Sequence, residues 1–255
     1  MTQEKTDLTK LSVAPTGWHR HPNGGGLVED TATVADTAFI GPNAEVCDEA
    51  QVYDEAQVCG YAQISGRVRV SGDARVFGSA RVSGDARVFG RAQVYDSANV
   101  YGRAQVYESA WVCGNAEVCD CTKVYGGAEV SDSATVSGHA KVHGHTKVYY
   151  ESQVFDLARV YGNAEVYAEA RVHGNAEVHG EAKVHGEAEV YGDSEVYGTS
   201  EVHGEAKVCD QAQVYGESEV CESALVYGEA MVYGYSFIAE KVKFCGEVYV
   251  RLSNS

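Results

Sequence analysis

The chain has no long apolar run and few of the residues that fill most globular cores. Leu, Met, Phe and Trp are rare among its 255 residues, and the apolar 44% is mostly Val, Ala and Tyr. No segment approaches the ~20 apolar residues of a membrane-spanning helix, and the first residues lack the apolar centre of a signal peptide. We therefore expect a cytoplasmic protein with a narrow core and no membrane partner.

Basic residues are scarce as well. The chain has 20 Lys and Arg against 37 Asp and Glu, which gives a net charge of −17. Phosphate backbones and anionic membranes are bound by clustered Lys and Arg, so the composition argues against nucleic acid as a partner. Between Glu151 and Glu229 there are 17 acidic and four basic residues, which predicts a chain whose second half is the more acidic.

The most regular feature of the sequence is an apolar residue at every sixth position. Stepping by six from Val28 reaches Val250 without an insertion or deletion, and every position on the way holds Val, Ile or Phe. The residue two places before is mostly Ala, and the residue two places after is mostly Gly, with Asp or Glu in most other hexads. A single short unit is therefore repeated along nearly the whole chain.

Each hexad, for example AEVYGD, predicts a short strand followed by a corner. Strand alternation directs its Ala and Val to one side, and Gly or Asp supplies the unusual backbone angle of the bend. Because so short a unit cannot bury its own apolar face, successive coils must stack and share a core. Three hexads close a triangular coil of 18 residues, and the stack is on the order of 60 Å long.

The predicted fold class is thus all-β, a single-domain parallel β-solenoid of about 12–13 coils with no inserted loops. We expect residues 1–27 to form an N-terminal cap, residues 28–251 the solenoid and residues 252–255 a tail.

The hexads of residues 158–178, ARVYGNAEVYAEARVHGNAEV, resemble those of bacterial hexapeptide-repeat proteins and, more closely, the YdcK-type β-solenoid group. Residues 21–46 resemble the entry into such solenoids, and the likeness covers about nine tenths of the chain. The resemblance implies a left-handed parallel β-helix. It also implies an alternative function, because hexapeptide-repeat proteins include trimeric acyltransferases and zinc carbonic anhydrases.

Residues that are three hexads apart are expected to lie one above another, so the register predicts ladders of side chains. The position after each core Val, expected to point outward, carries an unbroken ladder of rings on one face: Phe89, Tyr107, Tyr125, His143, Tyr161, His179, Tyr197, Tyr215 and Tyr233. A second face carries Tyr149, Tyr167, His185 and His203. Stacked rings stabilise neighbouring strands, and a contiguous aromatic surface also marks interfaces; both interpretations remain open.

A row of polar side chains runs beside the long ladder, two residues earlier in each hexad. Its basic members are Arg69, Arg87, Lys123, Lys141 and Arg159, after which come Glu177 and Glu195. Basic residues beside aromatic rings are typical of surfaces that stack bases and neutralise phosphates, whereas the acidic surroundings favour a solvated face or association between copies. These basic residues and the nine ladder residues form the candidate binding surface.

The eight cysteines do not indicate a disulfide framework, because no two of them are separated by one coil of sequence and reduced thiols are usual in cytosol. Cys119, Cys121 and His139 are a candidate metal-ligand group, since His139 is expected one coil above Cys121 and thiolate with imidazole suits zinc. Their spacing matches no established ligand pattern, so we expect neither a metal nor another cofactor.

The leading functional hypothesis is a non-catalytic scaffold or protein-binding rod that associates with copies of itself or with another protein. One alternative is an acyltransferase-like trimer; no loop long enough to form an acceptor pocket interrupts the repeat, so we assign no catalytic residue. A second alternative is an acidic decoy that imitates nucleic acid and captures a DNA-binding protein, by analogy of shape and charge.

Overall fold

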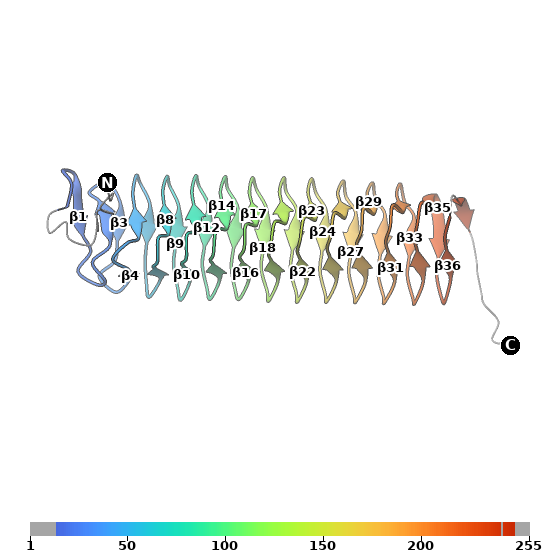
Figure 1. The fold of residues 1–255 in the computed structure, drawn as a ribbon, viewed down its shortest axis with the longest axis horizontal. Coiled ribbons are helices and arrows are strands. Elements are labelled where there is room, and N and C mark those ends of the chain that lie inside the picture. Colours follow the sequence, from blue (N-terminus) through green and yellow to red (C-terminus); the bar gives the residue numbers. More distant parts are fainter. Residues whose placement is uncertain (1–13, 241, 248–255) are drawn as a thin grey trace, which may run out of the picture.

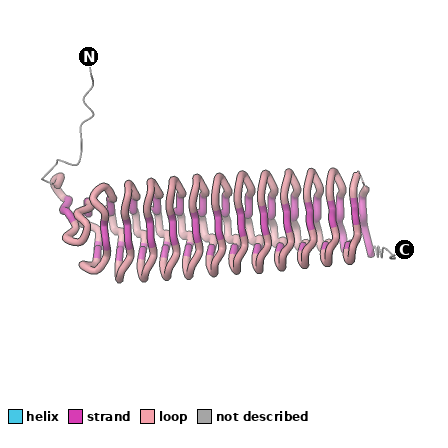
Figure 2. The backbone as a smooth tube through the Cα atoms, turned by 60° about the horizontal axis from the view of Figure 1, so that its bottom comes forward, coloured by secondary structure: helices cyan, strands magenta, loops and turns pink. Residues whose placement is uncertain are grey.

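The computed structural model describes residues 14–240 and 242–247, which form one straight rod of stacked coils (Figure 1). Three short strands per coil are joined by tight corners, and the strands of successive coils line up along the rod (Figure 2). The second face is a sheet of twelve strands, which corresponds to twelve coils. The predicted all-β parallel β-solenoid with three hexads per coil is confirmed; its left-handed sense stays a prediction of the family resemblance.

The first face contains the strands that precede the long ring ladder. Its strands are β3 (Thr33–Val34), β6 (Gln51–Val52), β9 (Arg69–Val70), β12 (Arg87–Val88), β15 (Gln105–Val106), β18 (Lys123–Val124), β21 (Lys141–Val142), β24 (Arg159–Val160), β27 (Glu177–Val178), β30 (Glu195–Val196), β33 (Gln213–Val214) and the end of β35 (Leu225–Val232).

The second face is β4 (Phe39–Ile40), β7 (Gln57–Val58), β10 (Arg75–Val76), β13 (Gln93–Val94), β16 (Trp111–Val112), β19 (Glu129–Val130), β22 (Lys147–Val148), β25 (Glu165–Val166), β28 (Lys183–Val184), β31 (Glu201–Val202), β34 (Glu219–Val220) and β36 (Phe237–Ile238).

The third face is β2 (Leu27–Glu29), β5 (Glu45–Val46), β8 (Gln63–Ile64), β11 (Arg81–Val82), β14 (Asn99–Val100), β17 (Glu117–Val118), β20 (Thr135–Val136), β23 (Gln153–Val154), β26 (Arg171–Val172), β29 (Glu189–Val190), β32 (Lys207–Val208), the start of β35 and β37 (Lys243–Glu247). Because β35 continues through a corner, it joins the first and third faces into one sheet of 25 strands.

From β2 to β36 the strands pair in parallel with a constant register of one coil, so that Val124 lies beside Val142 and Val142 beside Val160. Among the described strands, the register shifts only where β35 pairs with β37. At the N-terminal end, β1 (Trp18–Arg20) runs antiparallel to β2, and the expected boundary between cap and solenoid falls inside β2. The expected tail, residues 252–255, lies outside the described residues. In the described part of the chain, no helix is long and apolar enough to cross a membrane.

The core is a column of Val and Ala side chains that are fully buried through most of the rod. Ser and Thr replace Ala at several of these inward positions, and their hydroxyls are satisfied locally. Ser152 Oγ donates to the Tyr149 carbonyl at 2.9 Å, and Thr122 Oγ1 donates to the Cys119 carbonyl at 2.8 Å. Buried hydroxyls are tolerated here because each one finds an acceptor in the preceding strand or corner.

The corners contain the left-handed residues that the repeat predicts. Gly occupies most of these positions, and seven Asp residues, among them Asp120 with φ 58°, occupy others. Asp at this place has a second property that the repeat pattern does not reveal: Asp120 Oδ2 accepts the backbone N–H of Gly138 in the next coil at 2.9 Å. Asp48, Asp54 and Asp210 make the same contact with the next coil. Corner Asp therefore joins coils where the strand ladder is interrupted.

Candidate functional site

The long ring ladder on the first face is present as predicted from the register. From Phe89 to Tyr233, consecutive rings lie 4.6–5.3 Å apart between centroids and within 12° of parallel. The spacing equals the distance between strands, because each ring stands on the residue after a core Val in successive coils.

The ladder rings lie outside the buried Val and Ala core, but they do not form a fully exposed apolar stripe. All nine are half-buried, since each ring is covered by its neighbours above and below. At the same position Cys113 and Cys221 are buried. The most exposed large apolar side chains, such as Tyr61 and Tyr235, lie at corners instead. The stacked rings therefore act mainly as a second layer of packing outside the core.

The other faces carry shorter stacks. On the second face Tyr149, Tyr167, His185 and His203 stack as expected. Two further stacks were not singled out from the sequence, Phe77 on Tyr95 and the run Phe155, His173, Tyr191. The register of one coil would have found both.

The polar tip of many ladder rings reaches a Glu in the next coil. Tyr161 OH donates to Glu177 Oε2 at 2.9 Å, and His179 Nε2 lies 2.8 Å from Glu195 Oε1. In each pair the Glu stands two residues before the ring that stacks above. Burial, the hydrogen bond to Glu177 and the charge of that carboxylate raise the pKa of Tyr161 to about 12. The phenol of Tyr161 thus remains a neutral hydrogen-bond donor.

The row of polar residues beside the ladder separates charge along the rod. Its basic residues are vertical neighbours: Arg69 lies beside Arg87, and Lys141 lies between Lys123 and Arg159. Glu177 and Glu195 are likewise adjacent. Among the described residues, Arg159 alone of the five basic residues forms an ion pair, with Glu177 at 3.1 Å.

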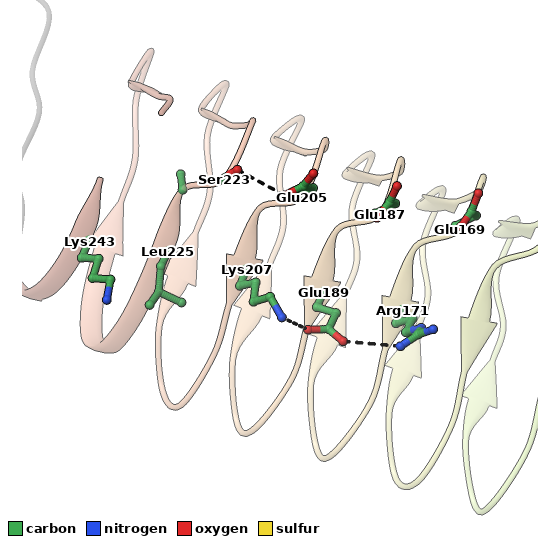
Figure 3. A pocket seen from close by; sticks show the side chains of 10 residues that line it. Glu169, Arg171, Glu187, Glu189, Glu205, Lys207, Ser223, Leu225 and Lys243 are labelled. Atoms are coloured by element: carbon green, nitrogen blue, oxygen red, sulfur yellow. Dashed lines mark hydrogen bonds and ion pairs between the residues drawn. The ribbon is translucent and has the colours of Figure 1, made fainter. Parts of the chain in front are cut away.

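On the third face Arg171, Glu189 and Lys207 alternate in sign along one side of an open hollow of about 470 Å³, whose other side carries the acidic row Glu169, Glu187 and Glu205 (Figure 3). Glu189 lies between two cations, with Lys207 Nζ at 2.6 Å and Arg171 Nη1 at 3.8 Å. The hydrogen bond from Lys207 is the main cause of the lowered pKa of Glu189. The second face alternates similarly along Lys147, Glu165, Lys183 and Glu201. Along these strand residues, each charge has a neighbour of opposite sign in the next coil, whereas like charges are adjacent over most of the row on the first face.

His143 differs from the other ladder histidines because cations flank it. It stacks between Tyr125 and Tyr161, and burial followed by the charges of Lys141 and Arg159 lowers the pKa of its imidazole below 6.5, against a weaker opposing effect of Glu108. The folded state therefore binds this proton less readily than the unfolded chain does. The stability that the neutral imidazole of His143 contributes is complete above the pKa that this group has in the unfolded chain. It is lost as the pH falls through the lower pKa that the group has in the folded state.

We accordingly expect His143→Tyr to increase the free energy of unfolding more at pH 5 than at pH 8. A tyrosine keeps the stack and removes the unfavourable protonation. Chemical denaturation of both proteins at the two pH values measures the effect, and an equal difference at both would contradict it. The other histidines are common to both proteins and cancel in the comparison.

All eight cysteines are free thiols. Burial is the main cause that raises the pKa of the Cys119 thiol, and it does the same for Cys209 and Cys221, which makes these thiols weak nucleophiles at neutral pH. In the described residues, the groups whose potential metal-ligand atoms all lie within 4.8 Å of one another are Glu29 with Cys47 and Asp48, and His203 with Glu219 and Cys221. The candidate group Cys119, Cys121 and His139 is not among them.

Three overlapping segments, residues 62–78, 68–84 and 80–96, match the family model described as the YdcK β-solenoid repeat. Each segment is close to one coil in length, and together they run from β8 to the end of β13. No curated protein matches the chain. The matched hexads continue into the rest of the rod in the same register, so the chain carries the YdcK β-solenoid repeat in residues 62–96 and the same coil geometry beyond them.

Proposed function

We propose that this protein is a non-catalytic rod that associates with a second copy of itself through the first face, with the two rods antiparallel. The observation that carries the proposal is the separation of charge along that face. Basic side chains occupy the row from Arg69 to Arg159, interrupted by Gln105, and acidic ones follow at Glu177 and Glu195. We also propose that the paired rods serve as a rigid scaffold for other proteins.

Like charges in adjacent strands repel each other, so the row from Arg69 to Arg159 is unfavourable within a single rod. The third face relieves such repulsion with alternating signs, as at Arg171, Glu189 and Lys207. On the first face, Arg159 alone of the five basic residues has such a partner among the described residues, Glu177 at 3.1 Å. For the other four, the proposed compensating charge comes from outside the chain. A partner with a complementary row provides it, and interfaces with matched potentials form faster and more specifically.

A second copy presents the complementary row when it is turned end to end. With a two-fold axis between Arg159 and Glu177, Arg159 of each copy faces Glu177 of the other. One coil further out, Lys141 faces Glu195 of the second copy. The contact is isologous, as in most homodimers. The ladder rings beside each charged row are half-buried, so they would form the apolar part of this contact.

The test is a charge exchange. We expect Lys123→Glu combined with Lys141→Glu to abolish dimers, because both copies then present acidic rows. Glu177→Lys combined with Glu195→Lys is expected to do the same, and mixing the two variants should restore a dimer. Sedimentation velocity at low and high salt measures the assembly, and the wild-type dimer should weaken as salt rises.

The matched control carries the same change of charge on another face, as Lys147→Glu combined with Lys183→Glu. It should remain dimeric. A wild-type protein that is monomeric at all concentrations, or a mixture of the two variants that stays monomeric, would overturn the proposal. Retention of the dimer by the Lys123→Glu, Lys141→Glu protein would place the interface elsewhere.

A further inference from the structure

The short stack on the second face ends in a mixed group of side chains. Tyr149, Tyr167, His185 and His203 stack in successive coils, and Cys221 takes the place of the next ring. His203 Nε2 lies 2.8 Å from Glu219 Oε1 in the next strand. A nitrogen, a carboxylate oxygen and a sulfur from two adjacent coils therefore converge, and these ligand atoms all lie within 4.8 Å of one another.

We propose that His203, Glu219 and Cys221 form a binding site for Zn²⁺, with solvent completing the coordination. Imidazole, carboxylate and thiolate are the ligands that zinc uses in proteins. Tetrahedral zinc holds such ligand atoms roughly 3.3–3.6 Å apart. His203 Nε2 and Glu219 Oε1 lie closer than this, at 2.8 Å, and the three ligand atoms lie within 4.8 Å of one another. Binding therefore requires the imidazole and the carboxylate to move apart and to give up their mutual hydrogen bond.

Burial and charge at this group suit a cation. Cys221 is 3% exposed, whereas the side chains of His203 and Glu219 are 28% and 41% exposed, which leaves a route for the ion and for a solvent ligand. The carboxylates of Glu219 and Glu222 lie near the Cys221 sulfur and give it negatively charged surroundings. Zinc binding releases the thiol proton to solvent.

The other group of potential ligands, near the N-terminal end, lacks these properties. Glu29, Cys47 and Asp48 include no imidazole. Both carboxylates are already engaged, because Glu29 accepts the backbone N–H of Asp48 and Asp48 accepts that of Gly66 at 2.8 Å. We assign no metal to it.

The chain itself contains a matched control, in which a phenol replaces the imidazole. Tyr101, Glu117 and Cys119 occupy the same three positions on the third face, with Tyr101 OH 3.4 Å from Glu117 Oε2 and Cys119 6% exposed. A neutral phenol is a poor zinc ligand, so this group is expected not to bind. It also shows that the coil accommodates a tyrosine at the position of His203.

The experiment measures Zn²⁺ affinity by competition with a chromogenic chelator, and uses Co²⁺ as a spectroscopic probe. We expect the wild-type protein to bind one equivalent of Zn²⁺ and its Co²⁺ adduct to show a thiolate-to-metal absorption band. His203→Tyr and Cys221→Ser should each weaken binding by about tenfold or more. Tyr101→His should create a second equivalent. Circular dichroism confirms that each variant retains the β-rod.

The proposal is overturned if the Co²⁺ adduct lacks the thiolate band, or if His203→Tyr binds Zn²⁺ as tightly as the wild type. Should Cys221→Ser fail to fold, His203→Tyr decides alone, because tyrosine preserves the stack and the hydrogen bond to Glu219. The proposal is independent of the dimer, since all three ligands come from one chain on the second face.

Discussion

Tyr161→Ala is expected to lower the free energy of unfolding by about 3 kcal/mol, although Tyr161 lies outside the Val and Ala core. The ring stacks on His143 at 5.2 Å and on His179 at 4.6 Å. Each aromatic pair contributes about 0.5–1.5 kcal/mol, and the apolar area that the ring covers adds a comparable amount. The substitution also leaves Glu177 without the phenol hydrogen bond.

Tyr161→Phe is the control, because it keeps both stacks and loses only the bond to Glu177. We expect it to cost at most about 1 kcal/mol. Urea denaturation followed by circular dichroism measures both variants. If alanine costs no more than phenylalanine, the rings do not stabilise the rod.

A corner substitution has the second largest expected effect: Gly144→Ala should cost about 2–3 kcal/mol. Gly144 has φ 82°, and a Cβ built on it would lie 2.6 Å from the carbonyl oxygen and 2.8 Å from the nitrogen of Gly162 in the next coil. The left-handed conformation alone costs an L-residue about 1–2 kcal/mol. The remainder is the shift needed to separate the two backbones.

The reverse substitution at another corner should have the opposite sign. Ala168 holds φ 60° without the polar side chain that makes this conformation tolerable for Asp. Ala168→Gly removes that strain, while glycine makes the unfolded chain more flexible, so we expect a net gain of roughly 0.5 kcal/mol. Thermal unfolding of the two variants tests the pair, and two changes of the same sign would refute the explanation by backbone strain.

Much of the candidate surface could be predicted from the sequence, because an uninterrupted period of six fixes which residues are neighbours. Phe89 and Tyr107 stack because they are one coil apart, and the same count placed Lys123 beside Lys141. The period does not predict contacts between side chains that occupy different positions of the hexad in adjacent coils. The pairing of His179 with Glu195 requires the side chains to lean toward each other along the strand, which a register alone does not give.

The metal-ligand groups show the same division. The sequence pointed to Cys119, Cys121 and His139 because they are close in number or one coil apart. The structure brings together His203, Glu219 and Cys221 instead, because ring and thiol share one position in adjacent coils and Glu219 leans back toward the ring. Cys121 is a corner residue, and corner side chains diverge on a convex rod.

The sequence by itself determined the all-β fold, the coil of three hexads, the Val and Ala core and the order of side chains along each face, because every local unit repeats the same strand and corner. Only the tertiary structure decided how deeply the ladder rings are buried and which ring hydroxyls and nitrogens contact a carboxylate. It also decided that His203, Glu219 and Cys221 are the potential metal ligands that converge. Those properties depend on how far each side chain reaches across the 4.6–5.3 Å between stacked rings, a distance in three dimensions that periodicity does not contain.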